Sequence, residues 1–125
     1  MDNLYQLIKI FGNPDALIDH WDTSSNRYAI WEFEETFSIN SKGEALLNGK
    51  LSHESPLELF QKTLDNWKSE SNELSAVGYI SYDFKNILFP HIAFSNPNST
   101  QPLLWFGKPK LVIPYRITES EIEKV

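Results

Sequence analysis

The clearest pattern of apolar and polar positions runs from residue 56 to residue 69. Residues 55–58 (Ser-Pro-Leu-Glu) form a capping box with proline at the first helical position, a combination typical of a helix start. Four apolar residues follow at helical spacing, with polar residues on the opposite face. The four are Leu57, Phe60, Leu64 and Trp67. This pattern predicts an amphipathic helix that buries these four side chains.

A second pattern, from Ala76 to Tyr82, combines β-branched and aromatic residues with little charge, and it predicts a strand. Apolar groups occur on both of its faces, so we expect the strand inside a sheet rather than at the edge. Gly78 within it indicates the close approach of another backbone or of a ligand. Asp83 ends the run and is interpreted as a cap for the turn at Phe84, with a position at an interface as the alternative.

Three further stretches favour strands. Residues 27–40 alternate, and the phase expected to face the core contains Ala29, Trp31, Phe33, Glu35 and Phe37. A bend or bulge near Glu34 and Glu35 would reset this register. Residues 41–43 (Ser-Lys-Gly) predict a hairpin turn before a short strand at 44–47. Residues 103–106 begin another strand, which residues 110–115 continue or pair with.

The amino-terminal segment carries weaker signals. Residues 4–11 alternate imperfectly and end at Gly12, which favours a first strand. Asn13 and Pro14 resemble a helix start, with Asp15 in the first turn, so a short helix is expected to run to Trp21. Together the segments predict an α+β fold, a mostly antiparallel sheet with helices on one face.

Composition narrows the class of protein. The chain has 125 residues, of which 41% are hydrophobic, enough for one domain with a core of its own. There are 17 acidic and 11 basic residues, and the net charge of −6 argues against a nucleic-acid surface. The absence of cysteine excludes disulfides and thiol catalysis. No apolar run approaches the ~20 residues of a membrane span, and the start is not a signal peptide, so we expect a cytoplasmic protein.

Two segments carry a family resemblance. GYISYDF at residues 78–84 and PLLWFGKPKLVI at residues 102–113 resemble the amino-terminal region of component I of the chorismate-utilising synthases, the para-aminobenzoate (aminodeoxychorismate) and anthranilate synthases. The Ser-Tyr-Asp and Leu-Trp-Phe-Gly motifs are more similar to those of the para-aminobenzoate branch, and the anthranilate branch is the alternative. The residues that carry the motif are Gly78, Tyr79, Ser81, Tyr82, Asp83, Trp105, Phe106 and Gly107.

The resemblance implies that this chain is one domain of a larger enzyme and that another domain carries the catalysis. Residues 1–117 would be the amino-terminal domain, half of the two-sheet synthase fold. Residues 118–125, which begin with another capping box, would start a linker or helix towards an absent carboxy-terminal chorismate-binding domain. The complete enzyme would aminate chorismate with ammonia, using Mg²⁺ and a glutamine amidotransferase subunit. We expect no catalytic residues and no cofactor in this chain, no turnover from it alone, and a homodimer when it is isolated.

The resemblance also implies a ligand site. Asp22, Ser24, Ser25 and Arg27 lie where the family places an acid-serine motif that binds a regulatory or structural tryptophan. A carboxylate and hydroxyls can hold an ammonium group, while aromatic side chains of a sheet sandwich the indole. The family's Leu-Leu-Glu-Ser is replaced here, and Trp21 is an alternative occupant of the indole pocket. The other interpretation is a turn whose Asp and Ser side chains cap backbone groups.

Other functions stay open at this point. A stand-alone tryptophan-sensing module is one, and an interaction domain for the glutaminase subunit is another. His20, His53 and His91 are too widely separated to match a helical pair of metal ligands, so we expect no metal site.

Overall fold

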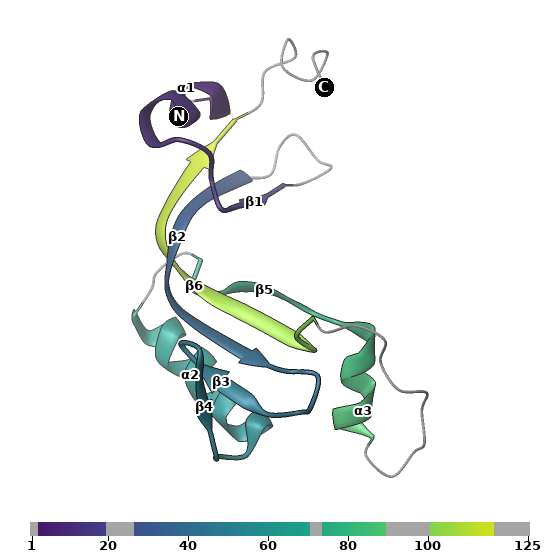
Figure 1. Cartoon of the computed structure of the whole chain (residues 1–125). Helices are drawn as coiled ribbons and strands as arrows, with labels where there is room; N and C mark the ends of the chain where they lie inside the picture. Colours follow the sequence, from purple (N-terminus) through teal and green to yellow (C-terminus); the bar gives the residue numbers. More distant parts are fainter. Residues whose placement is uncertain (1–2, 20–26, 71–73, 90–100, 117–125) are drawn as a thin grey trace. The chain divides into compact units, whose positions relative to one another are not determined.

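The computed structural model describes residues 3–19, 27–70, 74–89 and 101–116 (Figure 1). Their elements, in chain order, are α1 (Leu4–Phe11), β1 (Ala16–Ile18), β2 (Arg27–Ile39), β3 (Ala45–Leu47), β4 (Lys50–Ser52), α2 (Pro56–Glu70), β5 (Val77–Ile80), the 3₁₀ helix η1 (Tyr82–Phe84), α3 (Lys85–Leu88) and β6 (Leu104–Tyr115). Among these residues no helix is both long and apolar enough to cross a membrane.

The strands form one sheet in the order β4-β3-β2-β6-β5, with β1 pairing separately on β2. The pairs β1–β2, β2–β3, β3–β4 and β5–β6 are all antiparallel. The predicted α+β fold with a mostly antiparallel sheet is therefore confirmed. The hairpin turn at residues 41–43 is confirmed as well, and the two segments expected near residues 103–115 are one continuous strand, β6.

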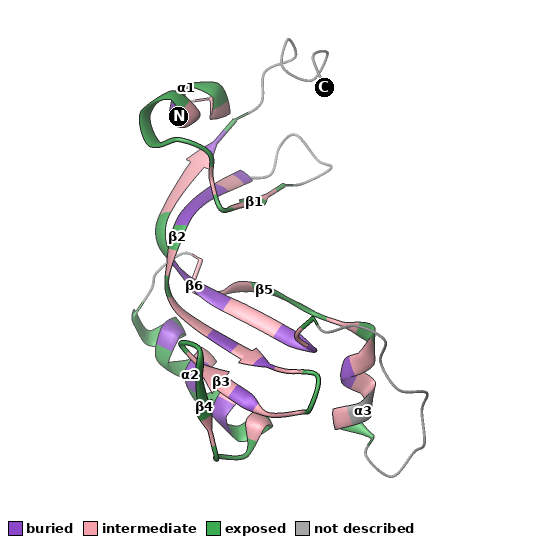
Figure 2. Ribbon diagram, in the orientation of Figure 1, coloured by how far each residue is buried: buried purple, intermediate pink, exposed green. Residues whose placement is uncertain are grey.

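The chain divides into two compact units. Unit 1 comprises residues 1–33 and 109–125, and unit 2 comprises residues 34–108. The long strands β2 and β6 contribute to both units. Each unit has its own buried cluster, and Figure 2 shows buried positions along both strands.

The helix predicted at residues 56–69 is α2 of unit 2, but its buried stripe is shifted. The inward residues are Leu59, Thr63 and Trp67, one turn apart, whereas Leu57 in the first turn is 41% exposed. Apolar side chains of β2, β3 and β6 cover this stripe, including Phe37 and Leu104. Burial of a large apolar side chain stabilises by about 1.5–3 kcal/mol, so this helix face contributes much of the stability of unit 2.

β5 lies at an edge of the sheet, so the prediction of an interior strand is wrong. Its apolar character on both faces is not explained by burial, because Tyr79 and Ile80 are exposed. The close approach predicted at Gly78 is confirmed. A Cβ atom there would overlap the carbonyl oxygen of Trp105 and lie 2.7 Å from Cγ of Phe106, on the neighbouring strand β6.

Two predictions for unit 1 are wrong, the strand at residues 4–11 and the helix after Pro14. Residues 4–11 form the helix α1, because Asn3 and Gln6 make a reciprocal capping box and Gly12, with φ 83°, ends the helix. The segment after Asn13 and Pro14 is the strand β1 rather than a helix. It pairs with β2 in the register Ala16↔Ile30, and this tertiary pairing outweighs the local helix signal.

β2 is irregular at Glu32, which has φ 62° and lies two residues before the bend predicted near Glu34 and Glu35. The left-handed conformation is uncommon for a residue with a side chain. Ahead of it Ala29, Ile30 and Trp31 are all buried, so the simple alternation expected for this strand does not hold. Ala29 and Trp31 form the core of unit 1 with Leu7 of α1 and Tyr115 of β6.

Candidate functional site

Of the residues predicted to bind tryptophan, Asp22, Ser24 and Ser25 lie outside the described residues. Arg27, the fourth, is buried at the start of β2, and its guanidinium forms a hydrogen-bonded ion pair with the carboxylate of Asp19. Arg27 therefore joins the end of β1 to β2. A ligand role for the other three residues stays a prediction.

The buried phenol of Tyr115 belongs to the same corner of unit 1. Burial raises its pKa above the usual value of 10.0, and the negative charge of Asp19 raises it further, while the positive charge of Arg27 lowers it. The neutral phenol is thus favoured in the folded chain. The ion pair of Arg27 with Asp19 and the buried Tyr115 thus contribute to the stability of unit 1.

The motif residues of β5 and β6 lie side by side. The register pairs Val77 with Gly107, Gly78 with Phe106 and Tyr79 with Trp105. The rings of Tyr79 and Trp105 stack with their centroids 6.5 Å apart. The two segments that carry the family resemblance, about twenty residues apart in the chain, are therefore neighbours in space.

The remaining motif residues follow β5 in η1. Tyr82 is largely exposed, with the ammonium of Lys85 3.7 Å from the centre of its ring. Ser81 occupies the position before the first turn, and Asp83 lies within that turn. The prediction that Asp83 caps the turn is therefore wrong, because the chain enters the turn two residues earlier.

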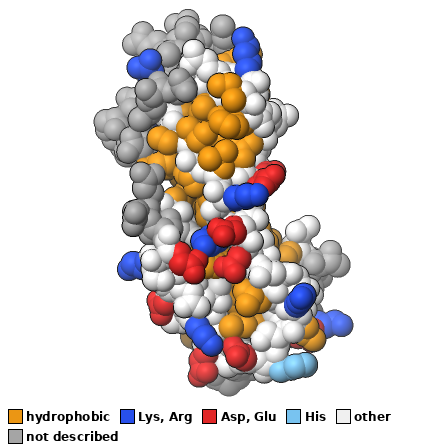
Figure 3. All heavy atoms as spheres, turned by 90° about the vertical axis from the view of Figure 1, so that its left-hand side faces the viewer, with side chains coloured by type: hydrophobic (Ala, Val, Ile, Leu, Met, Phe, Trp, Pro, Cys, Tyr) orange, Lys and Arg blue, Asp and Glu red, His pale blue; other side chains and the backbone are white. Residues whose placement is uncertain are grey.

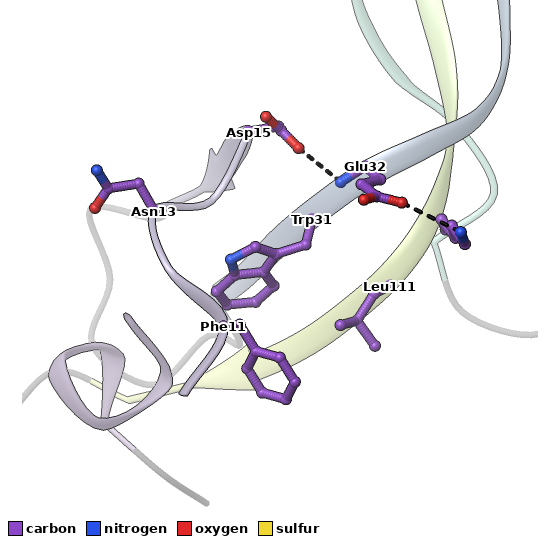
Figure 4. Close-up of a pocket in the computed structure, with 7 residues that line it drawn as sticks. Phe11, Asn13, Asp15, Trp31, Glu32 and Leu111 are labelled. Carbon is purple, nitrogen blue, oxygen red and sulfur yellow. Dashed lines mark hydrogen bonds and ion pairs between the residues drawn. The ribbon is translucent and has the colours of Figure 1, made fainter. Parts of the chain in front are cut away.

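A pocket of about 410 Å³ opens on the surface of unit 1 (Figure 4). Its lining comes from the end of α1, the segment before β1, the middle of β2 and β6, and consists of Phe11, Asn13, Asp15, Trp31, Glu32, Lys110 and Leu111. The rings of Phe11 and Trp31 have centroids 5.3 Å apart and are tilted by 49°. The indole N–H of Trp31 donates to the carbonyl of Gly12 at 3.0 Å, which fixes the ring.

Charged side chains form the other side of this pocket. Oδ2 of Asp15 accepts a hydrogen bond of 2.7 Å from the backbone N–H of Glu32, which holds the irregular turn of β2. The carboxylate of Glu32 pairs with the ammonium of Lys110 at 3.2 Å. Two carboxylates against one ammonium leave the lining with one net negative charge. Figure 4 shows the acidic groups opposite the aromatic rings.

A second charged cluster lies in unit 2. Lys108 of β6 is buried, pairs with Glu34 of β2 at 3.3 Å and forms a hydrogen bond with Glu70 of α2. The hydrogen bond to Glu70 raises the pKa of Lys108, burial opposes this, and Glu34 adds to the increase. Figure 3 shows acidic side chains gathered around a basic one in this region. The cluster ties α2 to the sheet, and its groups are all engaged with one another.

Sequence reasoning missed Lys108 and Asp15. Lys108 had a usable signal, because it is the one charged residue in the apolar run from Pro102 to Pro109. Asp15 was assigned to the first turn of a helix that does not form, so its contact with Glu32 was hidden. The described residues contain no group of three potential metal ligands, and His53 is exposed. His20 and His91 lie outside the described residues.

Comparisons with protein-family models, with curated proteins and with solved structures found no match to this chain.

Proposed function

We propose that this chain is a non-catalytic amino-terminal domain of a chorismate-utilising synthase component I, of the para-aminobenzoate type. The observation that carries the proposal is the register of β5 and β6. The two segments that resemble the family pair residue by residue, Gly78 with Phe106 and Tyr79 with Trp105. The two segments that carry the resemblance therefore form one structural unit, which supports treating them as a single motif.

The part played by this domain would be that of a scaffold. Around β5, η1 and α3 the side chains of several large hydrophobic residues are exposed, namely Tyr79, Ile80, Tyr82, Leu88 and Phe89. An exposed apolar group of this kind marks an interaction surface, and an edge strand offers unpaired backbone groups as well. In the complete enzyme the chorismate-binding domain would cover this surface. In the isolated chain a second copy would do so and form a homodimer.

The chemistry of the whole enzyme would reside in that other domain. Chorismate would be aminated there by ammonia from the glutamine amidotransferase subunit, and Mg²⁺ would be held by residues of the chorismate-binding domain. The complex would be cytoplasmic. Tryptophan binding near Asp22, Ser24 and Ser25 is a second, regulatory part of the proposal. It rests on the resemblance alone.

The test mixes the purified chain with a separately produced chorismate-binding domain of a para-aminobenzoate synthase, in the presence of ammonia and Mg²⁺. We expect association in analytical ultracentrifugation, and formation of aminodeoxychorismate faster than with the chorismate-binding domain alone. The chain by itself should give no product. Product from the chain alone, or no association at any concentration tested, would contradict the proposal.

A pair of charge substitutions locates the surface. Ile80→Glu would bury an unpaired carboxylate in the interface and weaken association about tenfold or more. Leu51→Glu is the matched control, because Leu51 is similarly exposed but lies on β4, at the opposite edge of the sheet. Equal effects of the two substitutions would rule out the β5 surface as the interface.

A further inference from the structure

The pocket of unit 1 has a chemical character that the proposed scaffold role does not use. Figure 3 shows hydrophobic side chains gathered at the surface in the part of the view that holds unit 1. In the pocket, the side chains of Phe11 and Leu111 are 44% and 37% exposed. Asp15 and Glu32 belong to the same lining, around a space of about 410 Å³, with their carboxylates directed to the backbone of Glu32 and to Lys110 (Figure 4).

We propose that this pocket binds a guanidinium group carried on an apolar stem. The lining has one net negative charge, which favours a cation over an anion. Asp15 uses Oδ2 for its hydrogen bond to Glu32, and its second oxygen points away from that bond in Figure 4 and can accept another. A guanidinium can donate to that oxygen, and of the two rings in the lining the indole of Trp31 lies nearer to it in Figure 4.

The same contacts argue against other ligands. An anion would meet one net negative charge, and two of the donors in the lining are engaged, because the indole N–H of Trp31 is bonded to Gly12 and the ammonium of Lys110 is paired with Glu32. The amide of Asn13 is an uncharged donor and would not offset that charge. A small ammonium ion is strongly hydrated and gains little from an aromatic wall, whereas a guanidinium is planar, weakly hydrated and stacks on aromatic rings. The methylene groups next to a guanidinium would lie over Leu111.

The experiment uses the full chain and four probes, because the guanidinium could come from a free metabolite or from the side chain of a polypeptide. Free L-arginine and N-acetyl-Phe-Arg-amide carry the group. L-Citrulline and N-acetyl-Phe-citrulline-amide are their neutral counterparts of nearly the same shape. The readout is the indole N–H resonance of Trp31 in ¹⁵N-correlated NMR spectra, assigned from the Trp31→Phe variant, since this N–H lies in the pocket wall.

We expect saturable shifts of the Trp31 resonance with the guanidinium probes and none with the citrulline probes. A response to L-arginine and to the peptide alike identifies a metabolite site, and a response to the peptide alone identifies a polypeptide ligand. Either supports guanidinium binding. Equal shifts with charged and neutral probes, or none up to solubility, would overturn it. These outcomes are independent of the synthase proposal, which the association test addresses.

Two variants sharpen the assignment by moving affinity in opposite directions. Asp15→Asn keeps the acceptor for the backbone of Glu32 but removes the charge, so binding should weaken about fivefold. Lys110→Met releases the carboxylate of Glu32 and removes a positive charge, so binding should tighten about threefold. Lys68→Met, at an exposed lysine of α2 in unit 2, is the charge-matched control and should leave the affinity unchanged. Weaker binding by Lys110→Met would contradict the proposal even if Asp15→Asn failed to fold.

Discussion

The two units of this chain are stabilised in different ways. Unit 2 rests on one amphipathic helix packed on a sheet, with Trp67 and Phe37 fully buried at its centre. Among the described residues unit 1 has the smaller core, and hydrogen bonds between side chains and backbone, such as Asp15 to Glu32 and Trp31 to Gly12, join its segments. Loss of apolar volume from the core of unit 2 should therefore have the largest effect on stability. Changes to single polar groups in unit 1 should have smaller effects.

The largest effect is expected in the core of unit 2. Trp67→Ala removes a fully buried indole and its hydrogen bond of 2.6 Å to Glu35, and should lower the free energy of unfolding by about 3–5 kcal/mol. Urea denaturation followed by circular dichroism measures this loss. Glu35→Gln, which keeps an acceptor, should cost about 1 kcal/mol or less. A loss below about 1 kcal/mol for Trp67→Ala would contradict the central place given to this residue.

An intermediate effect is expected at the edge of the same sheet. Gly78→Ala places a methyl group against the carbonyl of Trp105 and the ring of Phe106, and should cost about 1–3 kcal/mol and loosen β5 from β6. Amide hydrogen exchange of β5 measures the loosening. Gly49→Ala is the control, because Gly49 has φ 79° but no neighbour within 4 Å, so it tests backbone strain alone. Faster exchange in β5 is expected only for Gly78→Ala.

The smallest effect is expected in unit 1 and depends on pH. The pKa of Tyr115 is raised in the folded chain above the usual 10.0, so the unfolded chain loses this proton first as the pH rises. The stabilisation is complete below pH 10.0 and is lost as the pH rises towards the pKa in the folded state. Tyr115→Phe should flatten this alkaline decline in part, in denaturation curves recorded on either side of pH 10.0. An unchanged decline would show that Tyr115 does not titrate late.

The two units also differ in how much of their structure could be predicted from the sequence. In unit 2 the helix around Leu64 and the strand around Tyr79 were predicted, because the spacing of apolar residues in such segments reflects which side chains are buried. The inward face of α2 was shifted, since Leu57 fits the helical spacing as well as Leu59 does. The edge position of β5 was missed, because an uncharged strand resembles a buried one until its neighbours are known.

In unit 1 the signals were short and ambiguous. Residues 4–11 suit a strand or a helix, and the decisive capping box at Asn3 and Gln6 lies at the margin of the segment. Asn13 and Pro14 have the composition of a helix start, but the pairing of β1 with β2 prevents the helix. The candidate pocket lies where these predictions failed, so the sequence did not indicate it. Asp15 reaches Glu32 only because the segment is extended. The left-handed conformation at Glu32 could not be predicted, because the position holds no glycine.

The two borders of the sheet in unit 2 differ in a way that matters for any polypeptide that meets them. β4 begins with Lys50, whose charge hinders the addition of another backbone, whereas residues 77–80 of β5 carry no charge at all. We therefore expect a further strand to add at β5 rather than at β4. An incoming strand would extend the ladder beyond β5, and it would need a residue that tolerates Tyr79 and Ile80 as immediate neighbours.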